Sequence, residues 1–403
     1  MKAVFMGLGY IGLPTAAIAA SKGIDVVGVD INPEVVETIN QGKIHIVEPE
    51  LDKMVKEVVE KKKLRATLKP EEADVFLIVV PTPFKQNHRA DITYVENATR
   101  AVIPFLKEGN LFIIESTSPV KTTEKMAAII FKERPELKNR IHIAYCPERV
   151  LPGNVIYELE NNDRIIGGLN LKSSEKAIMF YSTFVKGILH STNARTAEMC
   201  KLTENSSRDV QIAFANELSI ICEQNGINVW ELIALANKHP RVNILQPGCG
   251  VGGHCIAVDP WFIVSDYPEQ SNIIKQARVT NDYKADWCAK RVIDTCHTFE
   301  IQNNREPVVA CMGLAFKPNI DDLRESPAKY ITSRILSEAR AEVLVVEPNI
   351  ATHKTFSLVN YNDAYQQADV IVWLVRHKEF LTLSQKDSKK IELDFCGIKY
   401  HTN

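Results

Sequence analysis

The feature that most constrains the fold is the alternation of short apolar runs with helix-like segments in the first third of the chain. Each run is rich in valine, isoleucine and other strand-forming residues. Continuous apolar runs of this length are typical of strands buried on both faces of a sheet. Strands that are separated by helices form βαβ crossovers, so the sequence predicts a parallel sheet. The runs are KAVFMGLG, DVVGVD, DVFLIVV, LFIIEST and IHIAYCPE.

The first run leads into the glycine motif GLGYIG, residues 7–12. In this setting Gly7 permits a tight turn, Gly9 lets a pyrophosphate approach the backbone, and Gly12 lets the helix pack closely against the strand. Asp30 ends the second run, where a carboxylate can bind ribose hydroxyls and repel a 2′-phosphate. The motif therefore predicts NAD as the cofactor in preference to NADP. A purely structural glycine turn is the alternative interpretation.

Polar residues follow two later runs at the edge of the sheet where ligands bind in such folds. Thr82 lies between two prolines after the third run, and Ser116 and Thr117 follow the fourth. We expect Thr82 and Thr117 to contact the cofactor, although turn formation alone would also explain these residues.

The rest of the chain predicts a helical middle and a second sheet. A long helix is expected over residues 196–225, closed by Gly226, with further helices over 227–236 and 273–298. Three apolar runs in the last hundred residues, PVVACMGLAFK, AEVLVVEPN and DVIVWLV, predict a smaller parallel sheet. The expected fold is α/β, with two Rossmann-like parallel-sheet domains joined by a long central helix and a helical dimerisation region. The expected domains are 1–195, which binds NAD, 196–298, which is helical, and 299–403, which contains the second sheet. The family resemblance described below implies that this last domain binds the substrate's nucleotide.

Composition limits the partners and the compartment. The 48 basic and 50 acidic side chains of the 403 residues give a net charge of -2, so charge indicates no nucleic-acid or membrane partner. No stretch approaches the roughly 20 apolar residues of a membrane span, and the glycine-rich start does not resemble a signal peptide. The nine cysteines are scattered, without paired spacing. They predict reduced thiols in a cytoplasmic protein.

Three polar residues share one face of the predicted long helix. Lys201, Asn205 and Arg208 stand at positions i, i+4 and i+7, whereas much of the remaining helix surface is apolar. A lysine and an asparagine in a largely buried helix need polar partners, and a substrate oxygen is one candidate. A solvated polar stripe is the alternative.

The segment GCGVGGHCIAVDP, residues 248–260, places Cys255 behind four glycines and four residues before Asp259. Glycines fill little core volume, which argues against a buried inert thiol. A metal site with Cys249 and His254 fits tetrahedral zinc spacing poorly, and we expect no metal. Together with a nicotinamide cofactor, the thiol suggests the oxidation of an aldehyde through a thiohemiacetal and a thioester.

With these motifs the chain resembles the UDP-glucose/GDP-mannose dehydrogenase family over nearly its whole length. The segments that carry the resemblance are ESTSPVKTTEK, YCPERVLPGN, RIIGG, EMCKLTENSSRDVQIAFANE, GVGGHCIAVDPWF and GLAFKPNIDDLRESPA, in that order. The resemblance implies a four-electron oxidation of a nucleotide-sugar C6 alcohol to a carboxylate by two NAD in succession. It points to UDP-N-acetyl-D-mannosamine as the substrate, and to surface polysaccharide or enterobacterial common antigen as the use of the product.

The resemblance also implies roles for individual residues. Cys255 is expected to be the nucleophile, Lys201 the acid–base group that stabilises the oxyanion with Asn205, and Glu148 the general base for thioester hydrolysis. Asp259 is expected to hold Lys201 or a catalytic water. The residues expected to bind the substrate are Arg149, Val150, Lys201, Asn205, Arg208, His239, Arg241, Gly252, Phe316 and Lys317. The residues expected to bind the cofactor are Gly7, Gly9, Tyr10, Ile11, Gly12, Asp30, Thr82, Thr117, Thr123 and Arg324.

A homodimer built on the long helix is implied as well, with His239 and Arg241 reaching the substrate of the neighbouring subunit. Cys249 departs from the family pattern. Because it is close to Cys255 in the sequence, an inactivating disulfide between the two is a hypothesis.

The alternatives for function are another nucleotide sugar (UDP-GlcNAc, UDP-glucose or GDP-mannose), a two-electron hydroxyacid-type dehydrogenase, and an inactive NAD-sensing or scaffolding protein.

Overall fold

The computed structural model describes residues 1–46, 48–85, 88–150, 153–384 and 389–400. The chain divides into two compact units, Met1–Glu204 and Asn205–Asn403, which we call unit 1 and unit 2. Helix α8 (Ala194–Gln224) begins in unit 1 and ends in unit 2. The predicted long helix is thereby confirmed, and Gly226 follows it with a φ of +65°, as expected for a glycine that terminates a helix.

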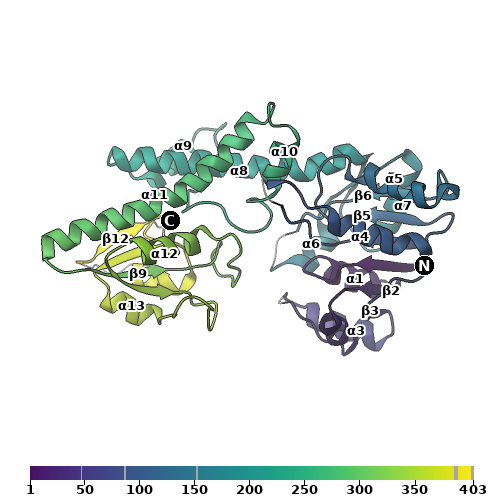
Figure 1. Ribbon diagram of the computed structural model, residues 1–403, viewed down its shortest axis with the longest axis horizontal. Coiled ribbons are helices and arrows are strands. Elements are labelled where there is room, and N and C mark those ends of the chain that lie inside the picture. The colour runs from purple at the N-terminus through teal and green to yellow at the C-terminus, as the bar shows by residue number, and fades with distance from the viewer. Residues whose placement is uncertain (47, 86–87, 151–152, 385–388, 401–403) are drawn as a thin grey trace. The chain divides into compact units, whose positions relative to one another are not determined.

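Unit 1 is built on an eight-stranded sheet with the order β3-β2-β1-β4-β5-β6-β7-β8 (Figure 1). The first six strands in this order are parallel, as in a dinucleotide-binding fold. The last two strands run the other way, because β7 pairs antiparallel with β6 and parallel with β8. The strands are β1 (Lys2–Met6), β2 (Asp25–Val29), β3 (Leu64–Thr67), β4 (Val75–Ile78), β5 (Leu111–Ile114), β6 (His142–Tyr145), β7 (Arg164–Gly168) and β8 (Leu189–Asn193).

Helices cover both faces of this sheet because alternate residues of each strand face opposite sides. In β1, Ala3 and Phe5 belong to one apolar core, whereas Val4 and Met6 belong to the other. The helices are α1 (Gly12–Ser21), α2 (Pro33–Asn40), α3 (Leu51–Glu60), α4 (Thr93–Val102), α5 (Thr122–Glu133), α6 (Val155–Asn161) and α7 (Leu171–Tyr181), with short 3-10 turns η2 (Ile103–Phe105) and η3 (Pro135–Leu137). Residues of α1, α3, α6 and α7 complete the first core, and residues of α4 and α5 complete the second.

Unit 2 contains a smaller, fully parallel sheet with the order β10-β9-β11-β12. Its strands are β9 (Val308–Met312), β10 (Glu342–Val346), β11 (Val370–Trp373) and β12 (Ile391–Asp394). Its helices are α9 (Val229–Ala236), α10 (Asp259–Asp266), α11 (Asn272–Asn303), α12 (Pro327–Glu338), α13 (Tyr361–Gln367) and α14 (Leu381–Ser384), with the 3-10 turn η4 (Lys378–Phe380). The predicted α/β class with two parallel-sheet regions and a long central helix is confirmed. The predicted domain limits 1–195, 196–298 and 299–403 stay a prediction.

A buried polar network joins α8 to α11 within unit 2. The Arg278 guanidinium donates to Asp209 Oδ1 at 2.7 Å, and the Asn281 amide donates to the same oxygen at 2.8 Å. Asn216 donates to Asn281 at 2.8 Å and accepts from the backbone N–H of Gly248 at 2.9 Å. The network therefore connects the crossing of the two long helices to the start of the cysteine loop.

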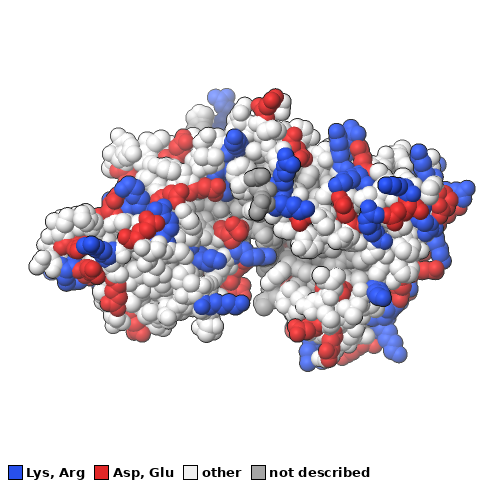
Figure 2. Space-filling view, viewed as in Figure 1, with Lys and Arg blue, Asp and Glu red and all other residues white. Residues whose placement is uncertain are grey.

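Positive and negative side chains are interspersed over the face shown in Figure 2. Among the described residues, no helix combines the length and apolar character that crossing a membrane requires.

The Arg278–Asp209 pair generates a stability prediction. Arg278→Met should leave the Asp209 carboxylate buried without its cation and lower the free energy of unfolding by about 3–5 kcal/mol. Urea titration followed by tryptophan fluorescence measures this loss in unit 2, because all four tryptophans lie there. They are Trp230, Trp261, Trp287 and Trp373.

The matched control is Lys290→Met, which removes an exposed ion pair with Asp294 on the same helix. Its cost should be below about 0.5 kcal/mol. Equal losses in the two variants would contradict the importance of the buried pair.

Candidate active site

The glycine motif between β1 and α1 has the geometry that its sequence predicts. Gly7 has a φ of +102°, and a Cβ added there would lie 2.5 Å from the Val79 carbonyl oxygen. A Cβ on Gly12 would lie 2.0 Å from the Gly7 carbonyl oxygen, so only glycine allows this contact of helix and strand. A Cβ on Gly9 would meet nothing within 4 Å. Open space beside the start of α1 fits a ligand phosphate, which the helix N-terminus favours.

Asp30 follows β2 and faces the same turn. Its Oδ2 accepts from the Leu8 N–H at 3.1 Å, and its Oδ1 accepts from the Asn32 N–H at 2.9 Å. Each carboxylate oxygen has two lone pairs, so both keep capacity for a ribose hydroxyl. The residues of unit 1 thus fit a dinucleotide. Tyr10, 44% exposed, and the half-buried Ile11 lie between the glycines at the start of α1.

The predicted threonines have protein partners. The Thr82 hydroxyl donates to the Thr117 carbonyl oxygen at 2.6 Å, which joins the chain after β4 to the chain after β5. Thr123 is fully buried, and its N–H and hydroxyl donate to Glu198 of α8 at 2.8 and 2.7 Å. The structure therefore gives Thr123 a role in fixing the start of α5 to α8. Its contact with a cofactor stays a prediction, as do those of Thr82 and Thr117.

Glu148 and its neighbours follow β6. The Glu148 side chain is nearly buried, and its Oε2 accepts from the Val150 N–H at 2.6 Å. Arg149 donates to the Asp163 carbonyl oxygen at 3.0 Å and pairs with Glu204 of α8 at 2.8 Å. The loop that carries Glu148 is thus fixed to α8 within unit 1.

Below this loop lies a buried cluster that the sequence analysis did not predict. The Arg164 guanidinium is 3.4 Å from Glu115 and 3.8 Å from the Cys146 sulfur, and it lies 4.9 Å from the centre of the Tyr181 ring. Tyr181 donates to Glu115 at 2.5 Å. Burial raises the pKa of Glu115 and raises that of the Cys146 thiol to about 11. Glu115, Cys146 and Arg164 lie in segments that carry the family resemblance. The four residues stand in separate parts of the chain, so no spacing in the sequence shows that they meet.

The three polar residues on α8 fall on both sides of the division between the units. Lys201 lies in unit 1 and is half-buried. In unit 2, the Asn205 amide donates to Asp259 Oδ2 at 2.5 Å, and Asp259 is 3% exposed. The sequence analysis expected Asp259 to hold Lys201 or a water, and the structure adds Asn205 as a partner. Arg208 is exposed one turn further along α8.

Cys255 lies in the turn that precedes α10, four residues before Asp259. Its carbonyl oxygen accepts from the N–H groups of Val258 and Asp259 at 3.0 and 2.8 Å, so the thiol-bearing turn is fixed to the start of the helix. Its side chain is half-buried and forms no disulfide. The Asn205 amide keeps a second N–H beyond the one that it donates to Asp259. The structure therefore places Cys255, Asp259 and Asn205 in one part of unit 2.

The glycines before Cys255 allow the main chain to pack against a second loop of unit 2. A Cβ on Gly252 would lie 2.6 Å from the Glu325 carbonyl oxygen and 2.7 Å from Phe316 Cβ. Gly253 has a φ of +82°, contacts the Phe316 ring and donates its N–H to the Arg324 carbonyl oxygen at 3.0 Å. The predicted Gly252 and Phe316 are thus brought together.

The remaining predicted substrate and cofactor residues of unit 2 lie at its surface. Lys317 is exposed beside Phe316, and Arg324 pairs with Asp322 at 2.6 Å. His239 and Arg241 are exposed after α9, where the Arg241 N–H donates to His239 Nδ1 at 3.3 Å.

Most other thiols are protected by burial. Burial raises the pKa of Cys249 and of Cys311 to about 12, and that of Cys296 to about 11. Cys249 is buried, and its thiol donates to the Leu374 carbonyl oxygen at 3.5 Å. None of the nine cysteines forms a disulfide. The structure gives Cys249 a place in the core, and it provides no disulfide with Cys255. In the described part of the chain, no three His, Cys, Asp or Glu side chains gather in a way that could hold a metal ion.

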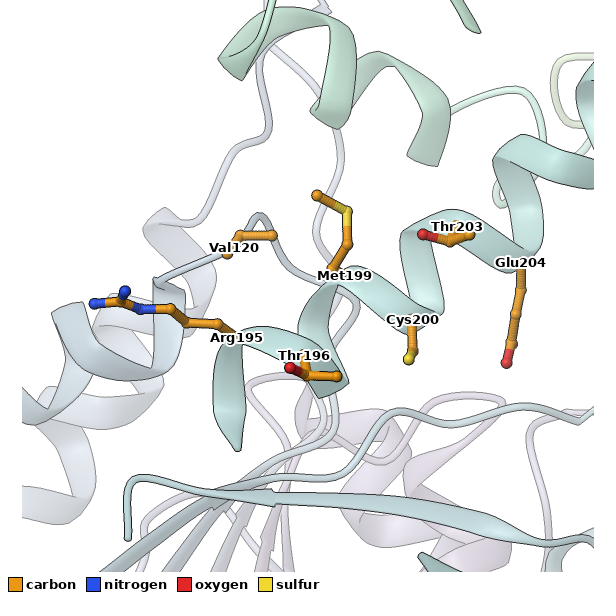
Figure 3. Close-up of a pocket in the computed structure, with 7 residues that line it drawn as sticks. All are labelled: Val120, Arg195, Thr196, Met199, Cys200, Thr203 and Glu204. Carbon is orange, nitrogen blue, oxygen red and sulfur yellow. The ribbon is translucent and has the colours of Figure 1, made fainter. Parts of the chain in front are cut away.

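A shallow pocket of about 480 Å³ lies on α8 within unit 1 (Figure 3). The residues of α8 that line the pocket are spaced three or four apart, so they share one face of the helix. Lys201, Asn205 and Arg208 lie on a different face. The pocket thus does not contain the predicted site residues. It is lined by Val120, Arg195, Thr196, Met199, Cys200, Thr203 and Glu204.

Three family models match the chain in succession. The NAD binding domain of the UDP-glucose/GDP-mannose dehydrogenase family matches residues 1–185, its central domain 195–283, and its UDP binding domain 310–397. The chain belongs to the UDP-glucose/GDP-mannose dehydrogenase family. It is an NAD-dependent nucleotide-sugar dehydrogenase, as the sequence analysis predicted.

Relatives within this family are similar over nearly their full length. A UDP-N-acetyl-D-mannosamine dehydrogenase from Campylobacter jejuni is 55% identical, covering 98% of this chain and 99% of the relative. An NDP-N-acetyl-D-galactosaminuronic acid dehydrogenase from Ralstonia nicotianae is 54% identical over 98% of this chain and 95% of its own. Among solved structures, the UDP-D-ManNAc dehydrogenase from Pyrococcus horikoshii has a TM-score of 0.89 at 40% identity, covering 99% and 96% of the two chains.

The geometry of the glycine motif predicts different effects for two matched substitutions. Gly12→Ala should lower the melting temperature of unit 1 by several degrees, because its Cβ would clash with backbone. Gly9→Ala should leave that temperature nearly unchanged and weaken NAD binding by about tenfold or more, because its Cβ would occupy open space meant for phosphate.

Circular dichroism measures the melting of each variant, and calorimetric titration with NAD measures binding. Unchanged NAD affinity in Gly9→Ala would argue against this dinucleotide site.

Proposed function

We propose that this protein oxidises the C6 alcohol of UDP-N-acetyl-D-mannosamine to the carboxylate of UDP-N-acetyl-D-mannosaminuronate. The observation that carries the proposal is the half-buried Cys255 in the turn before α10, which forms no disulfide and lies in the same unit as the Asn205–Asp259 pair. An aldehyde does not readily lose hydride until a nucleophile has added to it, and this thiol supplies that nucleophile. The names of two relatives that are 55% identical support the sugar.

The chain's own residues account for the chemistry. Bound NAD accepts one hydride in each of the two oxidations. The Cys255 sulfur bonds to the aldehyde carbon, giving a thiohemiacetal whose oxygen Lys201 and the free Asn205 N–H stabilise. Loss of hydride from that carbon gives a thioester. Glu148 then removes a proton from water, which adds to the thioester carbon and releases the acid and the Cys255 thiol.

Substrate and cofactor contacts complete the proposal. Gly7, Gly9, Gly12 and Asp30 hold NAD, whereas Phe316 and Lys317 face the nucleotide sugar. We place the reaction in the cytoplasm, a proposal supported by nine cysteines that form no disulfide. The product is an acidic sugar donor, suited to synthesis of a surface polysaccharide such as enterobacterial common antigen.

We also propose a homodimer formed through α8 and α11. Both helices expose large apolar side chains at helical spacing: Phe214 is 52% exposed and Ile221 48% on α8, and Val279 is 44% and Tyr283 54% on α11. Large apolar side chains exposed at such spacing along a helix are typical of a subunit interface. A second copy of the chain is the partner that matches it, and the exposed His239 and Arg241 are free to reach the neighbour's substrate.

Cys255→Ser tests the nucleophile. Wild-type enzyme should form two NADH per UDP-N-acetyl-D-mannosamine without free aldehyde, and the variant should lose acid formation by about a thousandfold or more. Absorbance at the NADH band and product chromatography measure both quantities. Cys200→Ser, which removes another half-buried thiol, should keep wild-type rates.

A covalent intermediate gives the decisive readout. In Glu148→Gln, where hydrolysis is slowed, mass spectrometry should find the sugar nucleotide attached to Cys255. Steady acid formation by Cys255→Ser would overturn the mechanism. Preference for UDP-GlcNAc, UDP-GalNAc, UDP-glucose or GDP-mannose in the same assay would overturn only the sugar.

Phe214→Glu tests the dimer. A charge in the middle of an apolar interface should convert the wild-type dimer of about twice the 45.3 kDa chain mass into a monomer. Light scattering after gel filtration measures the mass. Leu336→Glu, which changes a residue 45% exposed on α12, should leave the dimer intact. A monomeric wild type would refute the proposal.

A further inference from the structure

The turn after β9 in unit 2 repeats the geometry of the cofactor turn after β1 in unit 1. Both turns begin with the letters Met-Gly-Leu, and Gly7 and Gly313 both have a φ of +102°. The Gly7 N–H donates to the Val29 carbonyl oxygen at 2.8 Å, and the Gly313 N–H donates to that of Val346 at 2.9 Å. Each glycine therefore bonds the last residue of the neighbouring strand.

A carboxylate follows that neighbouring strand in both units. Asp30 accepts from the Leu8 N–H, and Glu347 accepts from the N–H groups of Leu314 and Ala315 at 2.8 and 2.9 Å. Glu347 thus stands where Asp30 stands, but it is 4% exposed, and all of its described contacts are with its own chain.

The second turn lacks the features that hold a pyrophosphate. Ala315 takes the place of Gly9 and Pro318 that of Gly12, and the chain continues as a loop until α12 begins at Pro327. No helix N-terminus therefore lies at this turn. Glu347 has a different role from that of Asp30.

That role is shown by His377, whose side chain is fully buried against Glu347. Its Nδ1 accepts from the Asn319 N–H at 2.9 Å, so the proton lies on Nε2, which donates to Glu347 Oε2 at 3.1 Å. The Asn319 side chain in turn accepts from the Lys378 N–H at 2.9 Å. Glu347 therefore fixes the start of the loop 314–319, and His377 fixes its end.

We propose that Glu347 and His377 are positioning residues that hold the loop 314–319 so that Phe316 and Lys317 receive the uridine diphosphate part of the substrate. The inference rests on the proposed function, which assigns these two loop residues to the nucleotide sugar. Phe316 also packs on Gly252 and Gly253, so the same pair sets the surface against which the cysteine loop lies.

The chemistry of Glu347 requires a carboxylate at this place. Five donors converge on its two oxygens: the N–H groups of Leu314 and Ala315, His377 Nε2, and the N–H and side-chain amide of Asn349. Burial raises the pKa of Glu347, and these donors lower it to about 2. An amide of the same shape accepts on only one oxygen and turns its own N–H groups toward donors, whichever way it is rotated.

Glu347→Gln tests the proposal on the full-length protein, with UDP as the probe. Backbone hydrogen exchange over 314–319 should accelerate by about tenfold or more, and the Kd for UDP should rise by about tenfold. The Kd for NAD should stay within about twofold, because that site lies in unit 1.

His377→Gln removes the acceptor for the Asn319 N–H without adding a charge, so it should loosen the end of the loop. This variant replaces Glu347→Gln in the test if Glu347→Gln does not fold. Glu338→Gln, which breaks an exposed pair with Arg334 on α12, is the control that should change none of these values.

Neither UDP affinity nor hydrogen exchange requires turnover. A failure of this proposal can therefore be distinguished from a failure of the proposed function. UDP affinity and loop exchange within twofold of wild type in the foldable variants would overturn the proposal. Faster exchange spread evenly over unit 2 would also overturn it, because it would show a general loss of stability without a local effect on the loop.

Discussion

The hydrogen bond from Asn205 to Asp259 is the interaction on which the arrangement of the candidate site depends. It joins α8 to the first residue of α10, and the Asp259 N–H holds the Cys255 carbonyl oxygen at the same point. Asp259 is buried, so the bond is protected from competing water. One residue, Asp259, therefore fixes the helix that carries an amide donor through its carboxylate, and the turn that carries the thiol through its backbone N–H.

The glycines of the cysteine loop give rigidity where the sequence alone suggests flexibility. Their missing side chains leave room for Phe316, the Glu325 carbonyl oxygen and Pro327, and the resulting contacts hold the loop from one side. The network through Asn216 holds its start at Gly248 from the other. A thiol that must bond one carbon atom and hold it while hydride leaves benefits from such a fixed main chain.

The sequence predicted the parts of the fold that have strong local signals. Buried runs such as those of β4, β5 and β9 are apolar throughout, and the long helix has a clear pattern with a glycine at its end. Four strands were not predicted: β3 (LRAT), β7 (RIIGG), β8 (LHSTN) and β12 (IELD). Polar residues interrupt β3, β8 and β12, and the buried β7 has only two apolar residues before its glycines, so none shows a long apolar run.

The same difference applies to the site. Glycine motifs and Cys255 were recognisable because their spacing has local meaning. Glu198, which holds Thr123 from 75 residues away, and the Glu347–His377 contact depend on tertiary folding, so no spacing in the sequence reveals them. The Asn205–Asp259 bond was also missed, although both residues were singled out, because the distance between two elements is not encoded in either.

The reversal of β7 has a consequence for the electrostatics of unit 1. In a wholly parallel sheet the carboxyl edge carries only strand ends, but β7 runs against β6 and so brings its first residue, Arg164, to the level of Cys146 and Glu115. A permanent cation thus lies beneath the loop that carries Glu148, in surroundings from which water is excluded. The change of strand direction supplies a fixed counter-charge that no ligand or ion has to bring.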